Sequence, residues 1–486
     1  MSKTFYITTP IFYPNANLHL GHAYNTTLVD ILARYHRLKG EEVYLLTGAD
    51  ENTEKVVRAA SLAGVETKEY LDGIVANFKS LFQKLSISYD QFIRTSDEKV
   101  HFPGAQEMWR RLVEAGDIEK RSYEGLYCVG HEAFITEKDL VNGKCPDHGE
   151  TPQGLKEENY FFKLSKYTKT VSEKIRSGEL QIIPETRRNE ILALLERGLE
   201  DVSFSRPSEK VSVGVKVPGD SSQTIYVWCD ALVNYLSALG FGRADDALFK
   251  KFWPADVHVI GKDILRFHAA IWPAMLLSAK LPLPKQLFVH GFITSGGKKM
   301  SKTLGNVIDP NELIAEYGGE AVRFFLARHI SPFEDGDITL ESFKEAYNAD
   351  LANGIGNLTS RIMKMAQDHL HDTNIRMEET NDTNKIPSDF LKAFDDYDVQ
   401  GATTIVSKAM STLDTRIQET APFKLIKIDK EKGRALIVEL VRELYTIARM
   451  LNPILPETSE KIKTLIKENR MPEISLFPRK VDNDSC

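Results

Sequence analysis

The chain has 486 residues, of which 42% are hydrophobic and 27% are charged, and its formal net charge is −7 at pH 7. This length exceeds what one hydrophobic core usually supports, so we expect several domains. The composition excludes a disordered or fibrous protein. The negative net charge argues against indiscriminate binding to nucleic acids, because such binding needs a local basic surface.

The first residues and the apolar segments favour a cytoplasmic protein without a membrane span. The N-terminal sequence MSKTFYITTPIFYP lacks the apolar core of a secretory signal. The sequence contains no apolar run of about 18 residues, the length that a membrane helix needs. The four cysteines are too few and too scattered for a disulfide framework, so we expect reduced thiols or metal ligands.

The first elements of the chain predict a nucleotide-binding α/β fold. Residues 3–9 and 42–47 are apolar and β-branched, which predicts two strands. Between them, Leu28, Ile31 and Leu32 recur with helical spacing. A strand–helix–strand unit favours a parallel sheet, whose ligands bind at the carboxyl ends of the strands.

Further along, an insertion is predicted to interrupt the sheet. Short turns, charged residues and pairs of Cys and His residues predict an inserted domain between residues 116 and 222. The sheet is expected to resume with strands at residues 224–230, 257–260 and 287–290. Residues 264–278 have a helical pattern.

The C-terminal part of the chain is predicted to be helical. We expect helices at residues 350–369, 389–417, 432–451 and 456–467. The acidic, Asn-rich residues 371–385 predict a loop between helices.

The first motif that carries chemistry is HLGH, at residues 19–22, between the first predicted strand and the first predicted helix. His19 and His22 can both donate hydrogen bonds to a phosphate, and a helix N-terminus favours negative charge. Asn15 and Asn17 are candidate caps for this helix. A motif of four residues is a weak signal by itself.

The second motif is KKMSKT, at residues 298–303, flanked by glycines that are typical of a mobile loop. Between Lys285 and Ile308 there are four Lys and no acidic residue. Such a loop can neutralise a triphosphate and stabilise charge on phosphorus in the transition state. The alternative interpretation is a solvated glycine turn.

Together, the two motifs resemble the HIGH and KMSKS signatures of class I aminoacyl-tRNA synthetases. Within that class the chain most resembles the methionyl-tRNA synthetase family. The resemblance covers nearly the entire chain, through YITTPIFYPNANLHLGH, VWCDALVNYL, HVIGKDILRFHAAIWPAML, VHGFITSGGKKMSKTLGNVIDP and the final LFPR. Such a series of segments is far more specific than either motif alone.

The resemblance implies an α/β fold class: a Rossmann-type nucleotide-binding catalytic domain with an inserted connective-peptide domain, followed by an all-α anticodon-binding domain. The boundaries that we expect are 1–115 and 223–288 for the catalytic domain, 116–222 for the insertion, 289–345 for the region of the KMSKS loop and the stem contact, 346–470 for the helical domain and 471–486 for a C-terminal tail.

The resemblance also implies a site for ATP, which would bind together with Mg²⁺ as the substrate. The expected catalytic residues are His19, His22, Lys299 and Lys302. The expected ATP-binding residues are His19, Gly21, His22, Gly261, Asp263, His290, Gly291 and Lys302. Catalysis would consist of positioning and charge stabilisation, without a covalent enzyme intermediate.

The family's methionine pocket maps onto Ile11, Tyr13, Asp50, Trp228, Ala231, Leu232, Tyr235, Ile264 and His268. A carboxylate at Asp50 can pair with the substrate ammonium, and aromatic walls suit a polarizable thioether. Without the motifs around them, the aromatic residues of this set would be interpreted as ordinary core residues. After Asp50 the family commonly has Glu-His-Gly, whereas this chain has Glu51-Asn52-Thr53.

The predicted insertion contains Cys128-x2-His131 and Cys145-x2-His148, a spacing that is typical of a zinc knuckle. Four nitrogen and sulfur ligands satisfy tetrahedral Zn²⁺ and leave no open position, so the role of this metal would be structural. The resembling family usually has Cys where His131 stands. The alternative is a metal-free knuckle whose two cysteines are packed in its core.

The predicted helical domain contains candidate anticodon readers. Asn357 and Arg361 have i, i+4 spacing on one helix face and match readers of the family. The third reader of the family is a Trp, and Phe423 stands at the corresponding position. Phe keeps a stacking surface for a base but loses the indole donor, which puts the strictness of anticodon discrimination in question.

The expected partners are methionine, ATP and tRNA(Met), and we expect a monomer because no appended OB-fold module follows LFPR. One alternative is a class I synthetase for another amino acid, such as cysteine, but that family binds its substrate through active-site zinc ligands that this pocket lacks. Another is a degenerate paralogue that binds tRNA without catalysis. That alternative predicts a broken signature, yet both histidines and both signature lysines are present.

Overall fold

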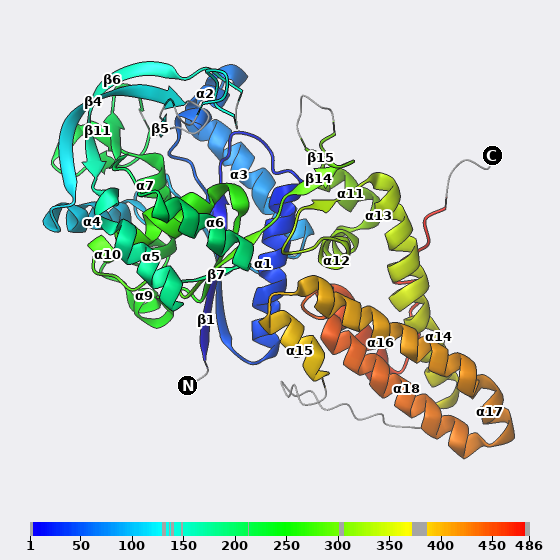
Figure 1. Ribbon diagram of the computed structural model, residues 1–486. Coiled ribbons are helices and arrows are strands. Elements are labelled where there is room, and N and C mark those ends of the chain that lie inside the picture. The colour runs from blue at the N-terminus through cyan, green and yellow to red at the C-terminus, as the bar shows by residue number, and fades with distance from the viewer. Residues whose placement is uncertain are drawn as a thin grey trace.

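The computed structural model describes residues 3–128, 133–135, 137, 140–146, 149–211, 213–300, 306–371 and 386–481. Figure 1 shows an α/β part and, extending from it to the lower right, a helical part that contains the C-terminal third of the colour range. No helix among these residues combines the length and the apolar character that crossing a membrane requires.

A six-stranded parallel sheet forms the centre of the α/β part. Its strands, in spatial order, are β3 (Gln91–Arg94), β2 (Glu42–Ala49), β1 (Thr4–Phe12), β12 (Val257–Gly261), β13 (Gln286–His290) and β7 (Gln181–Ile183). The order reverses between β1 and β12, and the carboxyl ends of strands at such a switch point are where ligands bind in open α/β sheets. This arrangement confirms the Rossmann-type fold class.

The first helix lies against this sheet and confirms the predicted strand–helix–strand unit. Helix α1 (Leu20–Leu38) buries Leu28, Ile31 and Leu32, the residues whose spacing predicted it. It is followed, after β2, by α2 (Glu54–Ala63) and α3 (Thr67–Lys84), and then, after β3, by α4 (Phe102–Glu114).

The predicted insertion is mostly antiparallel sheet. One sheet consists of β5 (Ala133–Ile135), β4 (Ile118–Cys128), β6 (Gln153–Phe162) and β8 (Val202–Ser203), and a second of β10 (Lys216–Val217), β11 (Asp220–Ile225) and β9 (Ser205–Pro207). In the sequence between β6 and β8, α5 (Thr168–Ser177) and α6 (Glu185–Glu196) flank β7, the edge strand of the central sheet. Residues 181–183 of the predicted insertion therefore belong to the central sheet.

The strand predicted at residues 224–230 was wrong beyond its first two residues. Strand β11 ends at Ile225, and helices α7 (Val227–Leu232) and α8 (Asn234–Ser237) follow. The amide of Asp230 donates a helical hydrogen bond to the Tyr226 carbonyl at 2.9 Å. A short apolar run that is buried on all sides lacks a periodicity that would separate a strand from a helix, which explains the error.

The segment between β12 and β13 is helical, as predicted, but it is not one regular α-helix. A 3-10 turn (Lys262–Ile264) and a π-helical segment (Phe267–Ile271) precede α10 (Trp272–Ser278). The remaining elements of the α/β part and its connection are α9 (Ala247–Phe252), β14 (Ile293–Ser295), β15 (Lys298–Lys299), α11 (Pro310–Tyr317), α12 (Gly319–His329), β16 (Gly336–Asp337) and α13 (Leu340–Ala346).

The helical part contains a π-helical segment (Tyr347–Gly356), α14 (Asn357–His369), α15 (Ser388–Asp395), α16 (Val399–Thr420), α17 (Pro422–Ile428), α18 (Lys430–Leu451) and α19 (Pro456–Glu468). The single helix predicted at residues 389–417 is divided into α15 and α16, because Tyr397 between them has a positive φ of 62°. Most of the loop predicted at residues 371–385 lies outside the described residues.

A buried arginine on α12 joins the two parts of the molecule. Arg323 is fully buried and forms an ion pair with Asp30 of α1 at 2.7 Å. Its guanidinium also donates hydrogen bonds to the carbonyls of Leu85, Pro453 and Ile454 at 3.0, 2.8 and 2.9 Å. The helical part is thereby fixed to α1 through its α18–α19 turn.

Candidate active site

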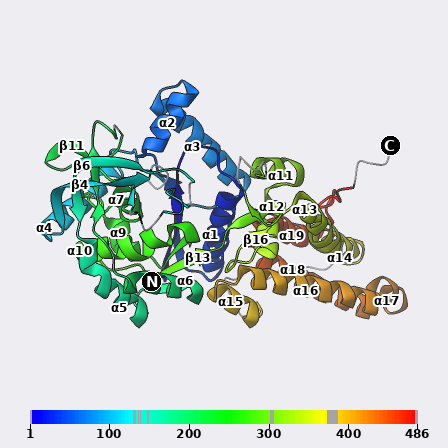
Figure 2. The ribbon, with the colours of Figure 1, turned by 45° about the horizontal axis from the view of Figure 1, so that its top comes forward.

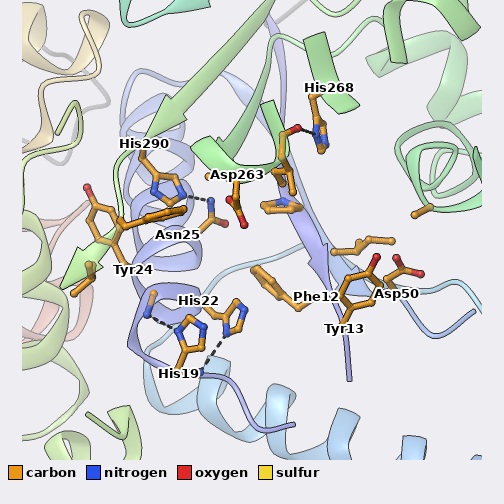
Figure 3. A pocket seen from close by; sticks show the side chains of 18 of the residues that line it. Phe12, Tyr13, His19, His22, Tyr24, Asn25, Asp50, Asp263, His268 and His290 are labelled. Carbon is orange, nitrogen blue, oxygen red and sulfur yellow. Dashed lines mark hydrogen bonds between the residues drawn. The ribbon is translucent and has the colours of Figure 1, made fainter. Parts of the chain in front are cut away.

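A cavity of about 350 Å³ opens at the carboxyl ends of β1, β12 and β13. Its lining includes all the residues predicted for a methionine pocket, Ile11, Tyr13, Asp50, Trp228, Ala231, Leu232, Tyr235, Ile264 and His268. The lining also includes His19, Gly21, His22, Gly261, Asp263, His290 and Gly291 from the predicted ATP site. The two predicted sites are thus parts of one cavity, and Figure 3 shows their labelled side chains around it.

The two histidines of the HLGH motif cap the helix that carries them. The Nδ1 atom of His19 accepts a hydrogen bond from the Gly21 amide at 3.0 Å, and Nδ1 of His22 accepts one from the His19 amide at 3.2 Å. The predicted capping by Asn15 or Asn17 was therefore wrong, because His19 itself is the N-cap residue. With both Nδ1 atoms accepting, each neutral imidazole carries its proton on Nε2.

The environment of His22 favours its neutral form. The rings of His19 and His22 stack with centroids 3.8 Å apart, and Phe12 contacts His22 edge-on. Burial and the neighbouring His19 lower the pKa of His22 to about 3. At neutral pH, His22 is therefore a neutral donor at the positive end of α1, where a helix attracts phosphate groups.

A second histidine site forms the opposite side of the cavity. The Asn25 side-chain amide donates hydrogen bonds to His290 Nε2 at 2.9 Å and to the Val259 carbonyl at 3.2 Å (Figure 3). His290 Nδ1 lies 2.7 Å from the Gly291 carbonyl, so this ring keeps its proton on Nδ1. Among the described residues, no donor reaches the buried Oδ1 atom of Asn25. Asn25 itself lines the cavity.

Glycine is required at one position of this side of the cavity. A Cβ atom on Gly291 would lie 2.2 Å from the backbone carbonyl oxygen of Glu334. The segment that contains Glu334 is held there by Asp335, which accepts hydrogen bonds from the Lys262 side chain at 2.7 Å and from the Phe292 amide at 2.8 Å. The absence of a side chain thus lets two backbone segments meet beside His290.

The other end of the cavity is aromatic. The Trp228 ring stacks on Phe267 with centroids 3.7 Å apart and an interplanar angle of 9°. The Tyr235 hydroxyl donates to His268 Nε2 at 2.8 Å, while His268 Nδ1 lies 3.1 Å from the Ile264 carbonyl. Burial lowers the pKa of His268 to about 4 and raises the pKa of Tyr235. Both side chains are therefore neutral, which suits an uncharged, polarizable ligand group.

A buried carboxylate also lines the cavity. Asp50 is 3% exposed, and its backbone amide donates to the Phe12 carbonyl at 2.9 Å. Tyr13 lies beside it in Figure 3, with the Lys55 ammonium 4.7 Å from the Tyr13 ring centre. A carboxylate in this position can bind an ammonium group whose substituent extends into the aromatic end.

The KKMSKT motif is described only in part. Its first residues form strand β15, which pairs with β14, and Met300 lines the cavity. The Asp337 carboxylate accepts hydrogen bonds from the Thr294 hydroxyl at 2.6 Å and from the Gly297 amide at 2.8 Å, and so holds the turn of this hairpin. The side chain of Lys299 and all of Lys302 lie outside the described residues.

The predicted zinc ligands are also described only in part. Cys128, at the end of β4, and Cys145 are buried. The Cys145 carbonyl accepts a hydrogen bond from the Gly149 amide at 2.8 Å. His131 and His148 lie outside the described residues. Within those residues, no cluster of three or more metal-binding side chains occurs.

The predicted anticodon readers lie in the helical part, far from the cavity. Asn357 begins α14, and Arg361 one turn later forms an ion pair with Asp414 of α16. Phe423 lies at the start of α17 and is 47% exposed. Figures 1 and 2 show α17 at the end of the helical part that points away from the central sheet.

Several residues of the cavity were missed by the sequence analysis. Phe12, Tyr24, Asn25, Asn234, Phe292, Ile293 and Met300 line it, and Phe267 supports one wall. Asn25 follows the HLGH motif by one helical turn, so its position on the face of His22 was a signal that could have found it. The aromatic and aliphatic residues of this set lack such a signal, because they are ordinary in any core.

Comparison with known proteins identifies related sequences over most of the chain. The family model for class I tRNA synthetases (M) matches residues 5–154 and 138–363. The methionine–tRNA ligase of Clostridium perfringens is 44% identical over 471 residues, which cover 95% of this chain and 73% of that protein. The methionine–tRNA ligase of Caldanaerobacter subterraneus subsp. tengcongensis is 42% identical over 472 residues, covering 95% and 74%.

Solved structures show the same similarity in three dimensions. Mycobacterium tuberculosis methionyl-tRNA synthetase in complex with methionyl-adenylate has a TM-score of 0.90 and 35% sequence identity, with 98% of this chain and 100% of that chain covered. The apo form of the same enzyme has a TM-score of 0.84 and 33% identity, with 99% of each chain covered.

Proposed function

This chain belongs to the family of class I tRNA synthetases for methionine, and we propose that it catalyses the methionine–tRNA ligase reaction. L-Methionine and ATP react to methionyl-adenylate and pyrophosphate, and methionine is then transferred to the 3′ end of tRNA(Met). The observation that carries this proposal is a single cavity that is lined by aromatic side chains, by the Asp50 carboxylate and by two histidines at a helix N-terminus.

In the proposed activation step, the methionine carboxylate attacks the α-phosphorus of ATP in line and pyrophosphate leaves. The Nε2 protons of His19 and His22 donate hydrogen bonds to phosphate oxygens, and the N-terminus of α1 adds its partial positive charge. Lys299 and Lys302 contribute positive charge to the departing pyrophosphate, with Mg²⁺ bound to the ATP substrate. Gly291, His290 and Asn25 would form the nucleoside side of the site.

Methionine recognition divides between one charge and an apolar surface. Asp50 pairs with the substrate ammonium, while Trp228, Tyr235 and Ile11 enclose the thioether. The Tyr235 hydroxyl and His268 are already hydrogen-bonded to each other at 2.8 Å, so the pocket offers the sulfur a neutral, polar edge without an unpaired charge. This division favours an amino acid with a flexible, uncharged side chain.

The experiment that tests the proposal is amino-acid-dependent exchange of labelled pyrophosphate into ATP, measured across the twenty protein amino acids with Lys302→Ala as control. We expect exchange with methionine alone, and a large loss of it in Lys302→Ala. Exchange with another amino acid would show that the pocket is assigned to the wrong substrate. Folded protein without any exchange would favour the tRNA-binding paralogue instead.

We also propose that Cys128, His131, Cys145 and His148 bind a structural Zn²⁺. The burial of both cysteines supports this assignment, and four protein ligands would exclude a catalytic role. Metal analysis of the purified protein should give about one zinc per chain. Cys145→Ser should release the metal, and zinc that remains in this variant would refute the ligand set.

The remaining finer assignments are proposals as well. We propose that Asn357, Arg361 and Phe423 read the anticodon, that the domain boundaries lie near residues 115, 222, 288, 345 and 470, and that the protein acts as a cytoplasmic monomer. Sedimentation equilibrium across a wide concentration range tests the monomer, because a dimer would double the mass at high concentration. Protection of anticodon bases by the wild-type protein, but not by Phe423→Ala, tests the readers.

A further inference from the structure

A fully buried polar network lies directly behind the methionine end of the cavity. The side chains of Asp230, on α7, and His101, the N-cap of α4, have no solvent-exposed surface and are 2.8 Å apart. The second carboxylate oxygen of Asp230 accepts a hydrogen bond from the Asn52 side chain at 2.7 Å. None of these three residues lines the cavity.

The hydrogen bonds of this network fix the position of the segment that carries Asp50. The Asn52 side-chain amide uses its two hydrogens on Asp230 and on the Thr95 carbonyl, the latter at 2.8 Å. The Glu51 amide donates to the Thr95 hydroxyl at 2.8 Å. The segment that begins with Asp50 is thus held by the end of β3 on one side and by α7 on the other.

The same network also fixes the position of α7, which forms the opposite wall of the methionine end. Asp230 lies on α7 between Trp228 and Ala231, both of which line the cavity. Its bond to Asn52 therefore joins the helix of the Trp228 wall to the segment of the Asp50 carboxylate. A buried carboxylate needs such donors, because an unpaired charge in the interior is strongly unfavourable.

Asn52 is also one of the positions at which this chain departs from the pattern of its family. A Cβ atom on Gly214 would lie 3.4 Å from the Asn52 Cβ, and Gly214 has a positive φ of 108°. The backbone of residues 213–215 thus passes close to Asn52, and a side chain at position 214 would contact the Asn52 side chain. Asn52 is enclosed on this side as well.

We propose that Asn52 and Asp230 are positioning residues for methionine: their hydrogen bond fixes the separation between the Asp50 carboxylate and the Trp228 wall. This inference rests on the proposed function, since it assigns the substrate ammonium to Asp50. Binding of the ammonium at one end and of the thioether at the other is optimal at one separation only. Loss of the hydrogen bond between Asn52 and Asp230 leaves the Asp50 carboxylate and the Trp228 ring in place but lets the distance between them vary.

The test compares Asn52→Ala with Asn159→Ala in the methionine-dependent exchange assay. Asn159 is a matched control, because it is also buried and donates to a buried carboxylate, that of Glu157 at 3.0 Å, within the antiparallel sheet of β6. We expect Asn52→Ala to raise the KM for methionine about tenfold, which corresponds to ~1.4 kcal/mol, with less than about a twofold change in the KM for ATP. Asn159→Ala should change neither KM.

Two methionine analogues separate positioning from general damage to the pocket. One has hydrogen in place of the ammonium group, and the other has hydrogen in place of the carboxylate. In Asn52→Ala, the inhibition constant of the analogue that keeps the ammonium should rise as the KM for methionine does, and that of the deaminated analogue should stay unchanged. A purely structural role would weaken both analogues alike, and this outcome would overturn the proposal.

Asn52→Leu provides a second variant that nearly keeps the size of the side chain, in case Asn52→Ala does not fold. A leucine side chain cannot donate a hydrogen bond, so the bond to Asp230 is lost. We expect the same pattern with the two analogues. If the wild type supports methionine-dependent exchange and Asn52→Leu has an unchanged KM for methionine, the positioning role is wrong while the proposed function stands. Wild type without methionine-dependent exchange would instead refute the proposed function.

Discussion

Replacing Asp30 by Ala should strongly destabilise the protein, because it leaves the Arg323 cation without its carboxylate. Both side chains are fully buried, and the ion pair is 2.7 Å long. Burial alone would raise the pKa of Asp30, but Arg323 and Arg34 outweigh it and hold this pKa below its usual value. The folded protein thus keeps the carboxylate charged and dependent on these partners.

The expected loss of unfolding free energy follows from the groups that lose their partner in Asp30→Ala. Removing one partner of a buried ion pair typically costs about 3–5 kcal/mol. Asp30 also accepts hydrogen bonds from the Ser88 amide and hydroxyl at 2.7 and 2.6 Å, which lose their acceptor too. Three carbonyls remain around Arg323 and soften the loss, so we expect about 3–4 kcal/mol.

The assay is urea unfolding followed by far-ultraviolet circular dichroism, with Asp368→Ala as the matched control. Asp368 pairs with Lys364 on the surface of α14 at 2.8 Å, and both side chains are at least 40% exposed, so this variant should lose less than about 0.5 kcal/mol. Adding Arg323→Met to Asp30→Ala should recover part of the loss, since it removes the stranded cation. An Asp30→Ala variant as stable as Asp368→Ala would refute the reasoning.

Three further predictions concern the cavity and the helical part. Burial lowers the pKa of His22 from 6.5 to about 3, so between these pH values the unfolded chain binds a proton that the folded chain does not. The stability of the wild type should therefore fall as the pH falls below 6.5. Between pH 7 and 5, the urea midpoint of His22→Asn should fall less than that of the wild type. Gly291→Ala places a Cβ atom 2.2 Å from the Glu334 carbonyl oxygen and should cost about 1–3 kcal/mol in urea unfolding, whereas Gly154→Ala, with no described atom within 4 Å of its new Cβ, should not. Phe423→Ala should lower kcat/KM for tRNA in aminoacylation about tenfold to hundredfold, the loss expected for one stacked base, and an unchanged value would exclude Phe423 as a reader.

The parts of the fold that the sequence predicted correctly are those whose residues form a pattern within one short segment. Parallel strands that are buried on both faces appear as continuous apolar runs, which is why β1, β2, β12 and β13 lie where such runs occur. The HLGH motif could be placed at a helix N-terminus because it follows one such run. The position of the cavity was therefore predictable from the residues that end the strands.

Other features depend on contacts between distant residues, which a local pattern does not contain. The capping of α1 by its own histidine requires Nδ1 of His19 to turn back onto the Gly21 amide, whereas Asn15 and Asn17 had the more usual chemistry for a cap. The bond between Asn52 and Asp230 joins residues that are 178 positions apart. Asn52 was seen only as a departure from a family pattern, and its partner was not predictable.

Helix α1 shows how such contacts relate the distant ends of the molecule. Its N-terminus holds His19 and His22 in the cavity. Near its other end, Tyr35 donates to Asp395 of α15 at 2.8 Å, across 360 positions of sequence, and α15 lies beside this end of the helix in Figure 1. Between these ends, Asp30 of the same helix pairs with the buried Arg323 of α12. One uninterrupted element therefore contacts both parts of the molecule. The helical spacing of Leu28, Ile31 and Leu32 identifies this helix, but its partners depend on the packing of residues that are hundreds of positions away.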